Sequence, residues 1–143
     1  MYYKDDPKYK NGNFTMFPNE ALCMDLSVGE IALYLYLLFR EDRKTYTCYP
    51  SGNQIAKDLN LSRSTVRKYI ELLERKGLIS TEQTSIYTKK YGKQNGNLKF
   101  TILPIKNVAD AYFERQIRAQ QAKIATEEAL RKYDEKHKKN NIK

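Results

Sequence analysis

Basic and hydroxyl side chains concentrate in the segment Ser62–Lys68 (SRSTVRK), at the start of a predicted helix. If its apolar residues Val66, Ile70 and Leu73 face a core, the polar residues between them project outward. Arginine can donate two hydrogen bonds to guanine, and serine or threonine hydroxyls suit bases or phosphates. The alternative is an ordinary solvated helix face. The residues expected to contact DNA are Arg63, Ser64, Arg67 and Lys68, with Thr65 at the margin.

The positive charge of the chain begins where this helix begins. The 143-residue chain carries a net charge of +9, yet the part up to Leu61 has seven basic and eight acidic residues. From Ser62 to Lys99 there are nine basic and three acidic residues. Such a local excess is typical of a surface that binds a polyanion. Further along the helix, Glu71 and Arg75 are spaced to form an ion pair on the surface.

Two helices and a turn position these residues. Ser51 and Gln54 have the spacing of a helix start, Ser62 caps the next helix, and Gly77 is placed to end it. Ser51 and Asn53, at the first of these helix starts, are candidates for a phosphate contact, since helix N-termini attract anions. A capping role alone for Ser51 is the alternative. The pattern predicts a helix-turn-helix.

A β-hairpin is expected after the second helix, with strands at Leu78–Thr81 and Leu98–Leu103. The polar segment Glu82–Asn97 lies between them and holds two glycines, so it is predicted to form a long basic tip. An alternative extends the first strand through residues 85–87. The tip residues expected to neutralise phosphates are Lys89, Lys90, Tyr91 and Lys93, although a merely solubilising loop has the same composition.

The remaining elements complete a recognisable order. Ser27 and Glu30 predict a capped, largely buried helix through Phe39, and residues 45–49 a short strand. The order helix, strand, helix, helix, strand, wing, strand, helix is that of a winged helix: mainly α with a small β-hairpin (α+β). The expected divisions are a flexible arm at 1–13, a DNA-binding domain at 14–105, a C-terminal helix at 106–136 and a disordered basic tail at 137–143.

The C-terminal helix is predicted from its richness in Ala, Glu, Gln, Arg and Lys without Pro or Gly. Its first half carries an apolar patch, expected to pack on the domain or to form a homodimer. A long coiled coil is not expected, because the later apolar residues are isolated. The patch consists of Val108, Ala109, Tyr112, Phe113 and Ile117.

Catalysis and cofactor binding are not expected. The single histidine, His137, lies near the C-terminus, and Cys23 and Cys48 make no metal-binding pair. No glycine-rich phosphate loop is present, and nothing indicates a small-molecule ligand or a metal. The N-terminal residues lack a signal-peptide pattern, and the longest apolar run, residues 31–39, is too short to cross a bilayer. A cytoplasmic, non-enzymatic protein without membrane contact is expected.

The chain resembles the winged helix-turn-helix family of plasmid and phage replication initiators and mobile-element regulators from Gram-positive bacteria. The matching segments are Tyr49–Ser51, Ile55–Ala56, Leu61–Val66, Leu73 and Gly77–Ile79, with Phe17–Glu20 and Leu26–Ser27 upstream. The resemblance implies sequence-specific binding of double-stranded DNA. It does not separate a repressor from an initiator, because both use this module. The leading hypothesis is a small transcriptional regulator of a mobile element, with an initiator that binds origin repeats as the alternative. A winged helix that binds only proteins is the third hypothesis.

Overall fold

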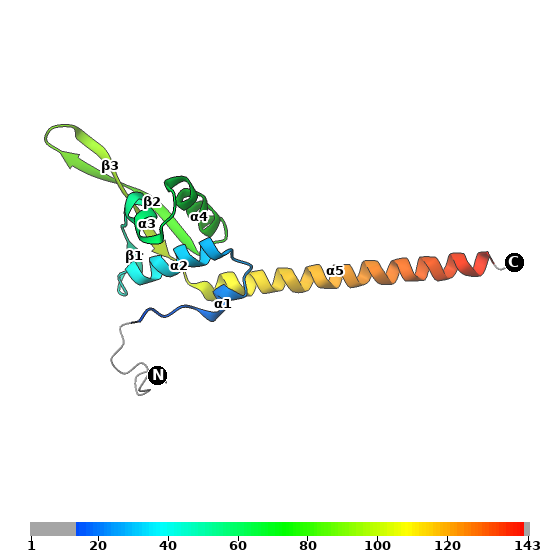
Figure 1. The fold of residues 1–143 in the computed structure, drawn as a ribbon. Coiled ribbons are helices and arrows are strands. Elements are labelled where there is room, and N and C mark those ends of the chain that lie inside the picture. Colours follow the sequence, from blue (N-terminus) through cyan, green and yellow to red (C-terminus); the bar gives the residue numbers. More distant parts are fainter. Residues whose placement is uncertain (1–13, 142–143) are drawn as a thin grey trace, which may run out of the picture. The chain divides into compact units, whose positions relative to one another are not determined.

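The computed structural model describes residues 14–141 and divides the chain into two compact units, Met1–Ile105 and Lys106–Lys143. The first unit holds four helices and a three-stranded sheet (Figure 1). Its helices are α1 (Asn19–Leu22), α2 (Val28–Arg40), α3 (Gly52–Leu59) and α4 (Arg63–Arg75). Its strands are β1 (Thr47–Cys48), β2 (Ile79–Thr88) and β3 (Gly92–Ile102).

Helix starts follow from capping serines. Ser27, Ser51 and Ser62 each accept a hydrogen bond from the backbone N–H three residues on, and Ser27 forms a full capping box with Glu30. Between α3 and α4 the chain turns at Asn60, which adopts a left-handed conformation (φ 55°), and Gly77 (φ 79°) does so after α4. These predicted helix boundaries are confirmed.

The core of the first unit lies between α2, α3, α4 and the inner part of the sheet. Gly29 in α2 makes room for the ring of Tyr69 in α4, because a Cβ atom there would lie only 2.1 Å from a ring carbon. The fully buried large side chains are Leu33, Tyr34, Leu37, Ile55, Val66, Leu73, Leu78, Ile79 and Phe100. This core holds α4 by one face and leaves the opposite face exposed.

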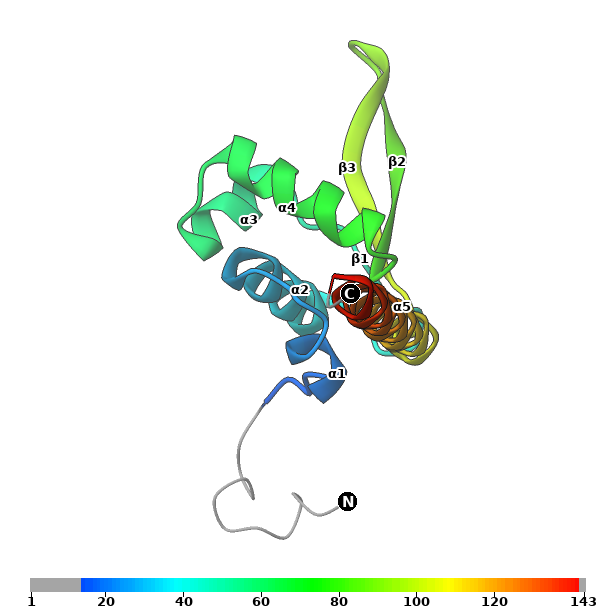
Figure 2. The same ribbon diagram turned by 90° about the vertical axis from the view of Figure 1, so that its right-hand side faces the viewer.

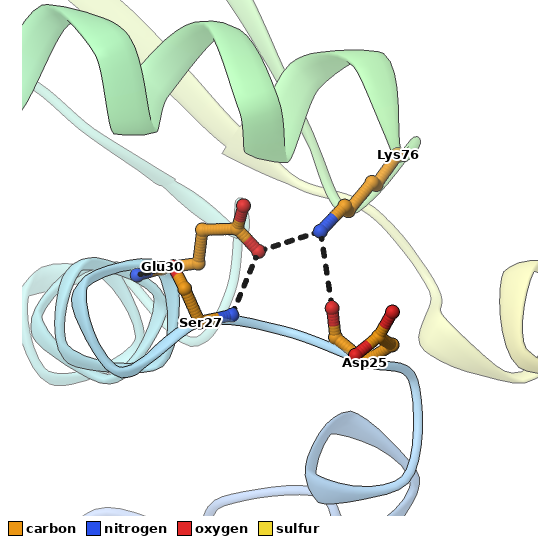
Figure 3. A network of polar contacts seen from close by, with 4 residues as sticks. All are labelled: Asp25, Ser27, Glu30 and Lys76. Carbon is orange, nitrogen blue, oxygen red and sulfur yellow. Dashed lines mark hydrogen bonds and ion pairs between the residues drawn. The ribbon is translucent and has the colours of Figure 1, made fainter.

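An ion pair joins the start of α2 to the end of α4 (Figure 3). Lys76 Nζ lies 2.7 Å from Glu30 Oε2 and donates a second hydrogen bond to the backbone carbonyl of Asp25. The same Glu30 oxygen accepts from the backbone N–H of Ser27. The Glu30 side chain is 4% exposed, so its charge is compensated almost entirely by these contacts.

The sheet has the strand order β1-β3-β2, with both pairs antiparallel. Strands β2 and β3 form a hairpin that extends well beyond helices α2, α3 and α4 in both views (Figures 1 and 2). The predicted extension of the first strand through residues 85–87 is confirmed. The prediction of a long loop is wrong, because Glu82–Thr88 pairs with Gly92–Lys99 and the loop is only residues 89–91. Gly92 (φ 68°) closes that loop in a left-handed conformation.

A β-bulge divides the hairpin into an inner and an outer part. Gln83 pairs with Leu98 but Ser85 pairs with Asn95, so β3 contributes an extra residue opposite Thr84. Gly96 is needed at this position, because a Cβ atom there would lie 2.5 Å from Thr84 Oγ1. Such a bulge increases the local twist and re-aims the strands beyond it. We call residues 84–96 the outer wing.

The second unit consists almost entirely of α5 (Ile105–Asn140). The helix begins before Val108 and continues beyond Lys136, so residues 137–140 are helical and the prediction of a disordered tail from 137 is wrong for them. Within this segment the ring of His137 stacks on Tyr133, one helical turn before it, with 3.9 Å between centroids. The predicted flexible arm at 1–13 lies outside the described residues.

Candidate nucleic-acid interface

Helix α4 presents two arginines to a cleft beside the sheet. The cleft has a volume of about 450 Å³ and a floor formed by Val66, Ile70 and Phe100. Arg63 and Arg67 line it, and both are exposed, one helical turn apart on the same face of α4. The opposite wall is the part of the hairpin on both sides of the bulge. Its polar lining residues are Thr81, Gln83, Asn95 and Asn97.

Arg63 is held in place by the start of α3. Its guanidinium donates a hydrogen bond to Asn53 Oδ1. It also lies directly over Gly52, where a Cβ atom would come within 2.9 Å of three guanidinium atoms. The sequence placed Asn53 near a phosphate but contained no sign of this contact or of the role of Gly52. A contact between two helices depends on their crossing angle, which residue spacing does not reveal.

The hydroxyls at the start of α4 belong to one network. Ser62 Oγ lies 2.7 Å from Thr65 Oγ1 and 3.1 Å from Ser64 Oγ, and it caps the helix by accepting from the Thr65 N–H. Thr65 is half-buried, whereas Ser64 and Lys68 are exposed and lie outside the cleft lining. Of the five predicted recognition-helix residues, only Arg63 and Arg67 therefore share the cleft.

At the start of α3, Ser51 Oγ accepts a hydrogen bond from the Gln54 N–H. The capping role expected for this serine is confirmed. Asn53 remains exposed beside it, with its amide group available after the contact to Arg63. These two residues and the guanidinium of Arg63 thus lie together at the N-terminal end of α3.

The outer wing carries three lysines and no acidic residue. Lys89, Lys90 and Tyr91 form the loop, and Lys90 Nζ lies 5.2 Å from the centre of the Tyr91 ring. Lys93 pairs across the hairpin with Tyr87, which is 84% exposed. The structure therefore brings the four predicted wing residues together at one end of the hairpin.

Tyr87 is an interface candidate that the sequence reasoning missed. Residues of β2 alternate between two faces, so Tyr87 shares a face with Thr81 and Gln83, which line the cleft. Thr81 donates a hydrogen bond to Glu74 in α4, which fixes this face toward the helix. Beyond the bulge, Tyr87 places an exposed aromatic ring opposite Lys93 on the outer wing.

The acidic side chains at the end of α4 differ from the expectation. No ion pair joins Glu71 to Arg75 in the described part of the chain, where Lys76 pairs with Glu30 and Glu74 accepts from Thr81. Lys76 and Glu74 are thus engaged by partners on α2 and β2. Glu71 lines the cleft without a hydrogen-bond partner among residues 14–141.

Other kinds of site find no support within residues 14–141. No three His, Cys, Asp or Glu side chains there gather as a metal site would require. No helix in the same range is long and apolar enough to cross a membrane. Both cysteines are free, and burial raises the pKa of the Cys48 thiol to about 11. An inert, protonated thiol is what such a position favours.

Comparisons with known proteins agree with this architecture. Residues 25–79 match a family model described as a helix-turn-helix domain. A solved structure of a possible transcriptional regulator from Methanosarcina mazei Go1 has a TM-score of 0.55 and 15% identity, covering 80% of this chain and 98% of that one. This likeness shows a shared fold. No curated protein matches the chain in sequence.

More distant similarities have TM-scores below 0.5. MepR from S. aureus, solved bound to an oligodeoxyribonucleotide, has a TM-score of 0.40 and 17% identity, covering 87% of this chain and 85% of that one. The adhesin competence repressor AdcR from Streptococcus pyogenes has a TM-score of 0.38 and 14% identity, covering 75% and 69%. The order of elements and the matched helix-turn-helix domain define the first unit as a winged helix-turn-helix.

Proposed function

We propose that this protein is a transcriptional regulator that binds double-stranded DNA in a sequence-specific manner. The observation that carries the proposal is the exposed face of α4, where Arg63 and Arg67 point into a cleft flanked by a cationic hairpin. In a helix-turn-helix the second helix enters the major groove by its N-terminal half. Helix α4 has its exposed arginines at that end and its core contacts on the other face.

The roles within α4 differ with position. Arg67 has no hydrogen bond or ion pair within residues 14–141, so its guanidinium is free to donate to guanine O6 and N7. Arg63, anchored at the start of α3 with Asn53 and Ser51, suits a phosphate at the groove edge. Ser64 and Lys68 face away from the cleft and suit the opposite strand's backbone. Thr65 supports the helix start through its hydroxyl.

The outer wing supplies sequence-independent affinity. Lys89, Lys90 and Lys93 neutralise phosphates next to the groove occupied by α4, and Tyr91 stiffens the loop beneath Lys90. Flexible lysines act as point charges and lack the planar fork that makes arginine a base reader. The hairpin thus adds to binding strength more than to sequence choice.

A homodimer is part of the proposal. Helix α5 exposes Phe113 (37%), Ile117 (58%) and Ile124 (46%) along one stripe, with apolar side chains that a twin helix would cover. Two recognition helices about 34 Å apart would then contact a palindromic site. Sedimentation equilibrium tests this directly: a dimer mass is expected at micromolar concentration, and a monomer mass at all concentrations would refute it.

The same module serves transcriptional regulators and replication initiators, so the cellular role is a separate part of the proposal. We infer that the protein regulates a mobile element and acts in the cytoplasm without a cofactor. The similarity of its fold to that of a possible transcriptional regulator supports the role as a regulator. Footprinting on the flanking genome separates this role from replication initiation. Protection of a promoter is expected, whereas protection of an array of direct repeats would point to an initiator.

The test of DNA binding itself uses a random duplex and a range of salt concentrations. Binding should be measurable at low salt, and the logarithm of the association constant should fall linearly with the logarithm of salt concentration. An absence of binding at low salt would overturn the proposal and leave a protein-binding winged helix.

A further inference from the structure

Glu71 continues the row of charged residues that α4 presents to the cleft. Arg63, Arg67 and Glu71 are spaced by four residues each, and all three line the cleft beside the hairpin. Side chains four residues apart lie on the same face of a helix. The Glu71 carboxylate thus follows the two arginines along the same face of α4.

No other group in the described part of the chain binds this carboxylate. Glu71 is exposed, and it has no hydrogen bond or ion pair within residues 14–141. Arg67 and Arg75 lie four residues before and after Glu71 on the helix, and neither forms an ion pair with it within residues 14–141. Glu74, one turn away, is instead engaged by the Thr81 hydroxyl at 2.8 Å.

An unpartnered carboxylate is an unusual feature for a surface that meets DNA. Ionised carboxylates only accept hydrogen bonds, and they are repelled by phosphates. In the major groove the donors on base edges are the amino groups of cytosine and adenine. Adenine N7 is an acceptor next to its amino group and repels a carboxylate, whereas cytosine presents its N4 amino group without that neighbour.

We propose that Glu71 is a specificity-determining residue that accepts a hydrogen bond from the N4 amino group of a cytosine in the major groove. The inference rests on the proposed DNA binding by α4. Four residues of helix span about 6 Å, which is roughly two base steps of DNA. The preferred site therefore contains a guanine contacted by Arg67 and a cytosine about two base pairs away.

The experiment selects bound duplexes from a random pool with the wild type, Glu71→Gln and Glu74→Gln. Wild-type protein should enrich a cytosine at one position of each half-site. Glutamine prefers adenine, so Glu71→Gln should shift that position toward adenine or lose the preference, with about tenfold less discrimination for cytosine. Glu74→Gln removes the same charge from a residue engaged by Thr81 and should keep the cytosine.

Two results would overturn the inference. The first is a wild-type site without a cytosine at the expected distance from the guanine, and the second is an unchanged cytosine preference in Glu71→Gln. Glu71→Ala provides a second variant, for which the preference should relax without any gain of adenine. Binding of wild type to random duplex at low salt is measured in parallel. If that binding fails the proposed function fails, and if only the base preference is unchanged this inference alone fails.

Discussion

Arg63 shows how a single glycine can place a functional side chain. Its guanidinium lies over Gly52 and is tied to Asn53, at the N-terminal end of α3. Any Cβ atom at residue 52 would displace the guanidinium, which is the mobile end of a long side chain. The cost of such a change therefore falls on the position of the charge and hardly on the fold.

Gly52→Ala should consequently weaken DNA binding without destabilising the protein. Loss of one well-placed hydrogen bond to DNA predicts a decrease in affinity of about threefold to tenfold. The free energy of unfolding should equal or exceed that of the wild type, because alanine favours helix more than glycine does. Fluorescence anisotropy and urea unfolding measure the two quantities. Unchanged affinity would mean that Arg63 does not contact DNA from this position.

A second residue-scale prediction concerns Glu41, at the end of α2. Burial raises the pKa of its carboxyl, and its Oε2 atom is buried without a hydrogen-bond partner in the described part of the chain. The folded state thus binds the proton more tightly than the unfolded chain. This contribution to stability is complete below the unfolded pKa of about 4.3, and it is lost as pH rises through the raised value.

Glu41→Gln removes that pH-dependent destabilisation. The stability of the variant relative to wild type should rise between pH 4 and pH 7, as measured by the free energy of unfolding in urea at both pH values. Glu20→Gln, at a residue on the exposed surface of α1, serves as the control. If the difference in unfolding free energy between Glu41→Gln and wild type is the same at pH 4 and pH 7, folding does not change the proton affinity of Glu41.

At the scale of elements, the orientation of α4 depends on its connection to α2. Lys76→Met would leave the nearly buried carboxylate of Glu30 without its cation. The Lys76 side chain is 34% exposed, so the destabilisation should fall between that of a surface pair and that of a buried pair, at about 2–3 kcal/mol of unfolding free energy. Adding Glu30→Gln should recover part of it. A double-mutant cycle with zero coupling energy would contradict this account.

The outer wing predicts a distinct response to salt. Replacement of Lys89, Lys90 and Lys93 by alanine should flatten the dependence of affinity on salt by roughly 0.9 in logarithmic slope for each phosphate that is no longer neutralised. The selected sequence should stay the same. Replacing Lys132, Lys136 and Lys138 of α5 by alanine removes equal charge elsewhere, and an equal flattening there would indicate a general charge effect.

The sequence predicted helices better than strands, for a physical reason. Serine caps and the left-handed Gly77 are local signals, so the starts of α2, α3 and α4 were accessible from residue spacing. The outer wing buries almost no apolar surface and lacks alternation, and it is held by backbone pairing across a bulge. Its polar composition therefore indicated a loop.

In the candidate site, too, features set by local spacing could be predicted and contacts between elements could not. Spacing along α4 was enough to place Arg63 and Arg67 on the exposed face, because it requires only the helical period. The partners of Asn53, Lys76 and Glu74 come from other parts of the fold, up to 51 residues away in the chain, and no local pattern encodes them. Residue spacing likewise does not reveal that Glu71 lacks a partner, because this depends on how the neighbouring Glu74 and Lys76 are engaged by other elements.

At the scale of the whole molecule, two units divide the work that we propose. The winged helix carries the charged cleft and hairpin, and α5 carries the exposed apolar stripe. Each can be altered separately, because their residues do not overlap. Sequence choice should follow changes in α4, and oligomeric state should follow changes in α5.

The central claim is that α4 selects the DNA sequence through Arg67, while Arg63 holds a phosphate at the groove edge. The most direct measurement compares dissociation constants for the selected duplex and for a random duplex, with wild type and with Arg63→Ala combined with Arg67→Ala. The ratio of the two constants should shrink by about tenfold or more in the variant. Arg115→Ala with Arg118→Ala, which removes equal charge from α5, should retain the wild-type ratio. An unchanged ratio in the α4 variant would contradict the account.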